Sequence, residues 1–214
     1  MERTRTWRAC QGLCRIYTTV MFDLKVYHLE NIPPQGGVLL ATNHQSYLDP
    51  ILLAVRLRRP VSFMARSSLF HNPYFGWLIR NLRAYPVRQG RADVAAIRET
   101  IRQLTAGNVL NVFPEGSRTE TGELGPMEKG TALIVRKAQV PVVCVAIDGS
   151  FEAWPKGQRL PRRHPIRVIY GKPMNLHELE PDQITSAIGE ELRELLNQLR
   201  KKELLPQMNT DSHR

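Results

Sequence analysis

A histidine followed five residues later by an aspartate is the feature of this sequence best suited to catalysis. His44 and Asp49 lie in the segment NHQSYLD, residues 43–49. If the chain turns back between them, the carboxylate of Asp49 contacts one ring nitrogen of His44 and leaves the other nitrogen free to accept a proton. Imidazole titrates near pH ~6.5, which suits it to taking a hydroxyl proton at neutral pH. A lone His–Asp pair with this spacing is more often a structural capping pair, so a catalytic dyad needs support from elsewhere in the chain.

A second polar segment, FPEGSR at residues 113–118, provides that support. Its Gly116 allows a close approach of the backbone to a ligand, and its Arg118 offers a forked donor for phosphate oxygens. Arg88 and Lys129 are two further cations that would join Arg118 around one phosphate monoester if the fold brings them together. Taken singly, each of these cations is typical of a solvated surface charge.

The elements that must position these segments follow an α/β pattern. Apolar runs bounded by turn residues predict strands at 38–42, 61–65, 109–113, 140–147 and 166–170. Amphipathic patterns predict helices at 51–57, 74–82, 94–105, 128–138 and 181–202. Asp49 and Pro50 carry the cap-and-proline signature of a helix start. Strands alternating with helices favour a single α/β domain with a mixed, largely parallel central sheet flanked by helices, whose strand ends gather catalytic groups.

An amphipathic helix is also predicted at the N-terminus, over about residues 4–24. Apolar side chains at helical spacing cover about half of its circumference, and Arg8 and Arg15 fall on the other half. Such a helix suits the boundary between lipid headgroups and acyl chains, but the same apolar face would also pack on a protein core. The aromatic segment at 69–82 offers a second apolar surface, which favours the membrane interpretation.

The net charge limits the classes of partner. Thirty Lys and Arg residues against twenty Asp and Glu residues give a net charge of +10, which favours an anionic partner such as nucleic acid, an anionic membrane or a phosphorylated substrate. The sequence lacks a helix-turn-helix pattern, aromatic RNP-type strands and a dense basic run, so we expect no nucleic-acid partner.

The cysteines and the lengths of the apolar runs indicate in which cellular setting the protein works. Three cysteines without a CxxC pair indicate no disulfide framework and a reducing setting. No apolar run approaches the roughly 18 residues that a spanning helix needs, and no secretory signal is recognisable. We therefore expect a peripheral or monotopic protein on the cytoplasmic side of a membrane. Without HExxH, His-x-His or a Cys/His cluster, we expect neither a metal nor a cofactor.

Four motifs, taken in order, resemble the PlsC-type lysophosphatidic acid acyltransferase family, the 1-acyl-sn-glycerol-3-phosphate acyltransferases. They are NHQSYLD at 43–49, AYPVR at 84–88, FPEGSR at 113–118 and VPVVCVAI at 140–147. The resemblance spans roughly residues 38–150, and the first and third motifs together are highly specific. It implies that His44 is the general base and Asp49 its orienting partner. The residues it implies for the glycerol-phosphate acceptor are Glu115, Gly116, Ser117 and Arg118, with Arg88 and Lys129 helping to hold the phosphate.

Three positions depart from the family pattern. Ser117 replaces the commoner threonine and keeps its hydroxyl group. Arg83 stands where a glycine often precedes the second motif, and Cys144 stands where a second proline is common in the fourth. These last two changes leave the shape of the acceptor site open.

The resemblance predicts transfer of a fatty acyl group from acyl-CoA or an acyl carrier protein thioester to 1-acylglycerol-3-phosphate, giving phosphatidic acid. Direct transfer is expected, because the sequence has no GxSxG elbow and no cysteine in a catalytic context. Open alternatives are another acceptor (glycerol-3-phosphate, another lysophospholipid or a lyso-aminolipid), a metal-dependent phosphoesterase using His44 and Asp49, and a non-enzymatic lipid-binding protein. We expect a membrane-associating segment at 1–30, an acyltransferase domain at 31–205 and a flexible tail at 206–214.

Overall fold

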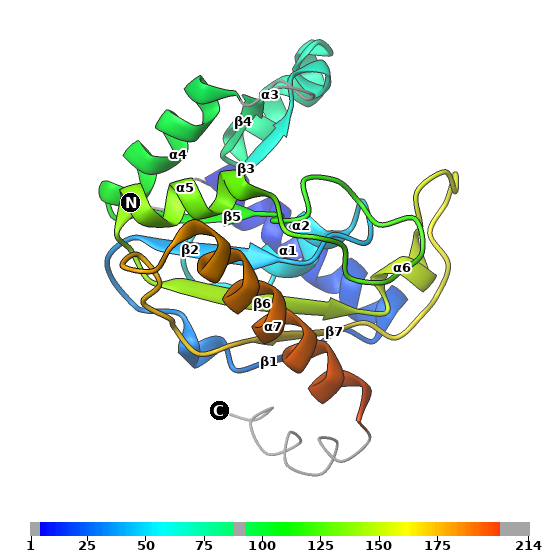
Figure 1. Ribbon diagram of the computed structural model, residues 1–214. Coiled ribbons are helices and arrows are strands. Elements are labelled where there is room, and N and C mark those ends of the chain that lie inside the picture. Colours follow the sequence, from blue (N-terminus) through cyan, green and yellow to red (C-terminus); the bar gives the residue numbers. More distant parts are fainter. Residues whose placement is uncertain (1–4, 88–92, 202–214) are drawn as a thin grey trace.

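A seven-stranded sheet forms the centre of the computed structural model, which describes residues 5–87 and 93–201 (Figure 1). The predicted tail at 206–214 and Arg88 lie outside the described residues. The strands occur in the order β1-β7-β6-β2-β5-β3-β4. Their bounds are β1 Lys25–Tyr27, β2 Val38–Thr42, β3 Val61–Arg66, β4 Ala84–Val87, β5 Val109–Val112, β6 Val142–Asp148 and β7 Arg167–Tyr170.

The strand pairing brings three strand ends to one edge of the sheet. All neighbouring strands are parallel except β6 and β7, which are antiparallel, so the predicted mixed, largely parallel α/β sheet is confirmed. Strand β2 pairs with β5 on one side and β6 on the other, with Ala41 opposite Val112 and Cys144. The C-terminal ends of β2, β5 and β6 therefore open onto the same place, where α/β folds collect their functional groups.

Helices cover both faces of the sheet (Figure 1). Helices α4 (Val94–Thr105), α5 (Lys129–Ala138) and α7 (Pro181–Arg200) pack on one face, the one toward the viewer. Helices α1 (Arg5–Phe22) and α2 (Asp49–Ala54) pack on the other. Helix α3 (Pro73–Asn81) lies beside the β4 edge, and short helices complete the chain at η1 Leu29–Asn31, η2 Ser67–Phe70 and α6 Ser150–Ala153.

The central strands form because their side chains are mostly apolar and many are β-branched, as is typical of strands buried on both faces. Every residue of β2 and β5 is buried, and in β6 all but the last are. Alternate residues of β2 enter the two cores, Leu39 on the side of α5 and α7 and Leu40 on the side of α1 and α2. This double burial fixes the strand register, and with it the position of the loop that follows Thr42.

The two edge strands were not predicted from sequence. Strand β4 contains Pro86, which cannot donate a ladder hydrogen bond and is tolerated in a sheet chiefly at an edge. Strand β1 has three residues, too few for a recognisable alternation. Arg83, just before β4, has a φ of 65°, in the left-handed region that favours glycine, which gives a physical reason for a glycine there in related proteins.

Helix α1 has two distinct apolar surfaces. Trp7 and Phe22 are buried against the domain, and the side-chain amide of Gln11 donates to the backbone of α2 and the residues after it. A different set of apolar side chains is exposed: Leu13 (69%), Ile16 (66%), Tyr17 (42%) and Val20 (61%). Core packing thus accounts for one face of the helix, and the membrane interpretation of the exposed face stays a prediction. In the described part of the chain, no helix is long and apolar enough to cross a membrane.

Candidate active site

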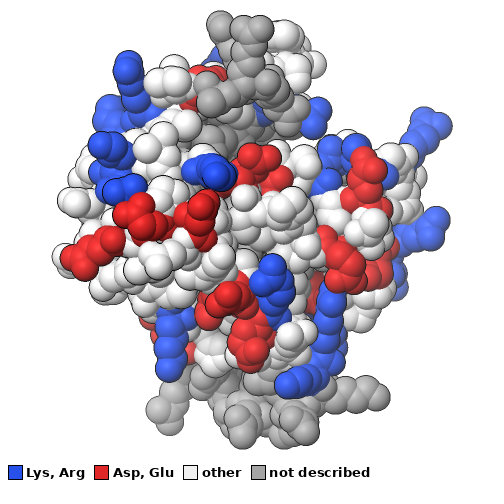
Figure 2. All heavy atoms as spheres, in the orientation of Figure 1, with Lys and Arg blue, Asp and Glu red and all other residues white. Residues whose placement is uncertain are grey.

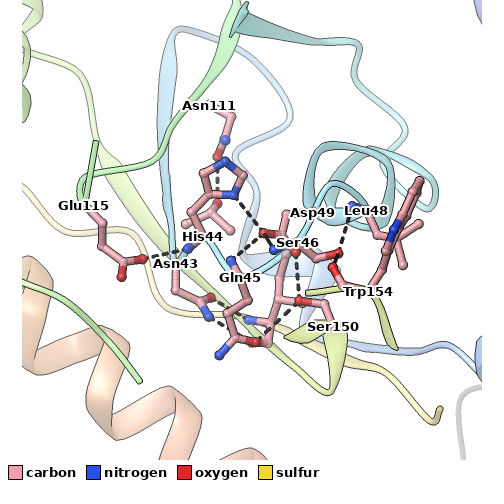
Figure 3. Close-up of polar contacts among 12 residues, drawn as sticks. Asn43, His44, Gln45, Ser46, Leu48, Asp49, Asn111, Glu115, Ser150 and Trp154 are labelled. Atoms are coloured by element: carbon pink, nitrogen blue, oxygen red, sulfur yellow. Dashed lines mark hydrogen bonds and ion pairs between the residues drawn. The ribbon is translucent and has the colours of Figure 1, made fainter. Parts of the chain in front are cut away.

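His44 and Asp49 form a direct hydrogen bond, as the sequence spacing allows. His44 follows β2 by two residues, and its Nδ1 lies 2.8 Å from Oδ2 of Asp49 (Figure 3). The same Oδ2 accepts from the backbone N–H groups of Gln45 and Ser46, each at 2.7 Å. Because Oδ2 accepts from both N–H groups, it is the acceptor toward the imidazole as well, so Nδ1 carries the ring hydrogen. The neutral ring then has its lone pair on Nε2.

Asp49 is wholly enclosed and fully hydrogen-bonded. Its side chain is fully buried, and its second oxygen, Oδ1, accepts from the Ser150 hydroxyl at 2.8 Å. Helix α2 does begin at Asp49, but Leu48 is its N-cap and no side chain caps it. The predicted Asp49 cap was therefore wrong: the carboxylate turns back to the loop before the helix because the N–H groups and imidazole there outcompete the helix end.

The ring of His44 is held on a second side by Phe113. The two rings stack with centroids 3.8 Å apart and planes inclined by 14°. The side chain of His44 retains 18% exposure, and among the described residues no hydrogen bond reaches its Nε2. A buried, paired Nδ1 and an accessible, unpaired Nε2 are what a general base needs.

Glu115 braces the backbone of the same loop. Its Oε1 accepts from the N–H of His44 at 2.6 Å, and its Oε2 accepts from the N–H of Gly125 at 2.8 Å. Burial raises the pKa of this carboxyl, and the two N–H groups oppose that rise. Both oxygens thus face backbone groups, so Glu115 positions His44 from outside the dyad; its predicted contact with an acceptor stays a prediction.

Further hydrogen bonds join the two catalytic loops. The backbone N–H of Thr119 donates to the carbonyl of His44 at 2.9 Å, and the side-chain amide of Gln45 donates to the carbonyl of Gly122 at 2.8 Å. Gly116 has a φ of 71°, and a Cβ there would lie 3.0 Å from Cγ of Glu128. These contacts hold the FPEGSR segment against the dyad although the two are far apart in sequence.

The predicted cations occupy different places. The guanidinium carbon of Arg118 lies 3.5 Å from the ring centroid of Tyr47, on the loop that carries the dyad. Lys129, in the first turn of α5, forms an exposed ion pair with Asp182 of α7 at 3.5 Å. Ser117 is exposed on the surface of the loop. The structure therefore brings Arg118 beside the dyad loop and pairs Lys129 with α7.

Comparison with known proteins agrees with this geometry. A family described as Acyltransferase matches residues 23–148, more than half of the 214 residues. The chain belongs to the acyltransferase family. The match covers β1 to β6, so it contains the loop that carries His44 and Asp49 and the FPEGSR loop that contacts it.

Individual relatives of this acyltransferase carry a more specific name. It is 26% identical to the 1-acyl-sn-glycerol-3-phosphate acyltransferase of Bacillus subtilis over 90% of this chain and 98% of that one. It is 30% identical to the chloroplastic 1-acyl-sn-glycerol-3-phosphate acyltransferase BAT2 of Brassica napus, over 72% of this chain and 45% of that protein. The chain thus spans about half the length of this plant relative.

A solved structure has the same fold as this acyltransferase. The crystal structure of the 1-acyl-sn-glycerophosphate (LPA) acyltransferase PlsC from Thermotoga maritima superposes with a TM-score of 0.79 at 26% identity. The alignment covers 91% of this chain and 80% of that one, so the likeness extends from α1 to α7.

Several supporting residues of the acyltransferase site were not predicted. Asn43 accepts from the N–H of Ile147 at 2.8 Å and donates to its carbonyl at 2.9 Å, which ties the dyad loop to β6 (Figure 3). Ser150 and Phe113 contact Asp49 and His44 as described above. Asn43 and Phe113 directly follow buried strands and Ser150 follows one by two residues, so position near a strand end was the one signal available. Among the described residues, no group of three or more His, Cys, Asp or Glu side chains is placed to hold a metal ion.

Proposed function

We propose that this acyltransferase moves a fatty acyl group from acyl-CoA or an acyl carrier protein thioester to the free hydroxyl of 1-acyl-sn-glycerol-3-phosphate, giving phosphatidic acid. One observation carries the proposal: His44 has its Nδ1 held by the buried Asp49 and its Nε2 unpaired among the described residues. The relatives' names supply the acceptor, since proteins so named match the chain over 66–90% of its length.

The arrangement supports direct transfer between donor and acceptor. Nε2 of His44 takes the proton of the acceptor hydroxyl as that oxygen attacks the thioester carbonyl. The new carbon–oxygen bond forms, the carbon–sulfur bond breaks, and the departing thiolate recovers the proton from the imidazolium. Asp49 stabilises the imidazolium through Nδ1 without taking its proton. The hydrogen bonds from Gln45, Ser46 and Ser150 hold Asp49 in place during this cycle.

The phosphate of the acceptor is bound by cations near the dyad. Arg118 lies between Glu115 and Thr119, which both form hydrogen bonds with the backbone of His44, so the chain at Arg118 is held next to the base. Arg88 and Lys129 complete this group in our proposal, with Lys129 leaving its exposed pair with Asp182 when the acceptor binds. Ser117 and Gly116 contribute a hydroxyl and an open backbone to the same pocket.

The enzyme works at the cytoplasmic surface of a membrane, held by the exposed face of α1. Arginines surround the apolar residues Leu13, Ile16 and Val20 of this face: Arg163 donates to the carbonyl of Val20 at 3.1 Å, and Arg56 donates to the Thr19 hydroxyl at 3.2 Å. An apolar stripe bordered by cations matches the acyl and headgroup layers of an anionic bilayer.

Product formation with a panel of acceptors tests the function. Wild type is supplied with oleoyl-CoA and, in turn, 1-acylglycerol-3-phosphate, glycerol-3-phosphate and 1-acylglycerophosphocholine, and lipid products are identified by mass spectrometry. We expect phosphatidic acid from the first acceptor at the highest kcat/KM. Arg118→Ala should raise the KM for that acceptor by about 10- to 100-fold, because a charge-assisted bidentate contact is lost.

Arg102→Ala, which removes an exposed arginine from α4, serves as the matched control and should leave the KM unchanged. A preference for glycerol-3-phosphate would overturn the proposed acceptor while retaining the chemistry. Unchanged acceptor kinetics in Arg118→Ala would remove Arg118 from the phosphate site.

A further inference from the structure

Tyr47 forms a platform for the guanidinium of Arg118. The guanidinium carbon lies 3.5 Å from the centroid of the tyrosine ring, at the short end of the range for cation–π contacts. Tyr47 is 50% exposed, although large aromatic side chains are usually more buried. It follows His44 by three residues, so the platform is part of the loop that carries the catalytic dyad.

One donor of Arg118 is left without a partner. Nη1 of Arg118 is buried and has no hydrogen-bond partner in the described part of the chain. A guanidinium that rests on an aromatic ring by its face keeps its N–H groups pointing outward in its own plane. A buried donor without a partner costs free energy, which an anionic oxygen in that plane would recover. Hydrogen bonding by the Arg118 side chain, and next its charge, lowers the pKa of the Tyr47 hydroxyl, which agrees with their close contact.

The platform itself is fixed from the side of α6. The ring of Trp154 lies 5.4 Å from that of Tyr47, centroid to centroid, with the planes inclined by 49°. Its indole N–H donates to the carbonyl of Gln158 at 2.9 Å, and its carbonyl accepts from the Ser46 hydroxyl at 2.8 Å. The orientation of the Tyr47 ring is thus set by groups that also contact the dyad loop.

We propose that Tyr47 is a positioning residue that holds Arg118 by its aromatic face so that the guanidinium edge receives the phosphate of the acceptor. This inference rests on the proposed function, because the phosphate belongs to the acceptor named there. Tyr47 acts through its ring and not through its hydroxyl. The contribution to acceptor binding therefore depends on Arg118 being present.

Four variants test this role: Tyr47→Leu, Tyr47→Phe, Arg118→Ala and the double variant Tyr47→Leu with Arg118→Ala. Tyr47→Leu should raise the KM for 1-acylglycerol-3-phosphate by about 3- to 30-fold, the span expected from loss of a cation–π contact. The KM for the thioester donor and kcat should stay within about twofold, since the dyad is untouched. Tyr47→Phe keeps the ring and should stay within about twofold of wild type.

The double variant separates positioning from general disturbance. If Tyr47 acts through Arg118, removing the ring adds less than about a twofold further increase in acceptor KM once Arg118 is alanine. An equal increase in both backgrounds, or a Tyr47→Phe variant as impaired as Tyr47→Leu, would overturn the inference. Thermal unfolding of each variant checks that the fold is retained, as expected for a half-exposed side chain.

Calorimetric titration of a soluble short-chain 1-acylglycerol-3-phosphate makes the two proposals distinguishable. Suppose that Kd rises in Tyr47→Leu but not in Tyr47→Phe, and that the wild type shows no turnover. This result would contradict the proposed reaction and support the role of Tyr47. Turnover by the wild type, with Kd and KM unchanged in the Tyr47 variants, would support the proposed reaction and contradict the role of Tyr47. Neither binding nor turnover of this acceptor would contradict both.

Discussion

The buried carboxylate of Asp49 accepts several of the hydrogen bonds that hold the site together. Its two oxygens accept from an imidazole, two backbone N–H groups and a hydroxyl, at 2.7–2.8 Å. Such a fully satisfied group is stable in a buried setting, whereas removal of its charge would leave donors without partners. At the residue scale, the structure therefore links the tautomer of His44 to the folding of the loop around it.

Asp49→Asn should affect both activity and stability. An amide cannot accept on all sides, so the variant favours the wrong tautomer of His44, and we expect kcat to fall by about 10²- to 10⁴-fold. The free energy of unfolding should fall by about 1–3 kcal/mol, because a buried donor loses its acceptor. Steady-state kinetics and urea unfolding measure these effects. Asp182→Asn, at an exposed position, is the control; a kcat within tenfold of wild type in Asp49→Asn would contradict a catalytic dyad.

The free energy of unfolding should depend on pH through Glu115, and the burial of this carboxyl sets the direction of that dependence. Burial raises the pKa of this carboxyl above its usual 4.5, so the folded chain holds the proton more tightly than the unfolded chain. Its contribution to stability is thus fully present below pH about 4.5 and is lost as the pH rises through the folded pKa. We expect the advantage of wild type over Glu115→Gln in unfolding free energy to shrink as the pH rises from about 4 to 7.

Urea unfolding across that pH range measures the difference, and Glu123→Gln removes the same charge from an exposed site as a control for net charge. A wild-type advantage that grows with pH would show that the two N–H contacts outweigh burial.

Residue types and local spacing sufficed to predict the contact between His44 and Asp49, because the two are close in sequence and the intervening loop turns back. The bonds from Glu115 to His44 and from Ser150 to Asp49 join residues 71 and 101 positions apart. Only the pairing of β2 with β5 and β6 brings them together, so no local pattern could reveal them.

At the scale of elements, α1 is both part of the core and an exposed apolar surface. Removing the helix would take Phe22 out of the core, so single substitutions on the exposed face are the sharper test. Ile16→Glu places a charge where we expect acyl chains, and should weaken binding to anionic vesicles by about 10-fold or more without lowering Tm. Leu133→Glu makes a matched change on α5, on the other side of the sheet, and should have little effect.

Vesicle flotation or co-sedimentation measures the binding. Equal loss in Ile16→Glu and Leu133→Glu, or none in either, would mean that α1 is not the membrane-facing element.

The central elements were predictable and the edges were not. The buried strands and long helices appear within a few residues of their predicted bounds, because apolar periodicity reflects burial directly. Strand β4 was not predicted because it contains Pro86, and it forms by pairing with β3, which no local sequence pattern shows. The boundaries proposed for the membrane segment and the acyltransferase domain, 1–30 and 31–205, stay predictions.

The whole molecule has a net charge of +10, but basic side chains do not dominate every face of its surface. Figure 2 shows acidic and basic side chains intermingled on the face covered by α5 and α7. On α1, in comparison, Arg163 donates to the Val20 carbonyl and Arg56 to the Thr19 hydroxyl, next to the exposed apolar residues. We propose that these local cations beside an apolar face, and not the long-range field, direct this side of the molecule to an anionic membrane.

Binding to anionic vesicles should therefore weaken with salt. Raising NaCl from about 50 to 500 mM shortens the screening length from about 14 to 4 Å, and should lower the partition coefficient by about 10-fold or more. Neutral vesicles should show weaker binding with little salt dependence, which isolates the apolar contribution of α1. Salt-independent binding to anionic vesicles would contradict a role for these arginines.

In the proposed reaction, His44, held by Asp49, performs acyl transfer to a phosphorylated lipid. The most direct test is thiol release from oleoyl-CoA and from an acyl carrier protein thioester, with and without 1-acylglycerol-3-phosphate. Wild type, His44→Ala and, as a matched control, the exposed His28→Ala are compared. We expect acceptor-dependent release with at least one donor, lost by about 10³-fold or more only in His44→Ala. Release that persists in His44→Ala, or no release from either donor by the wild type, would contradict the account.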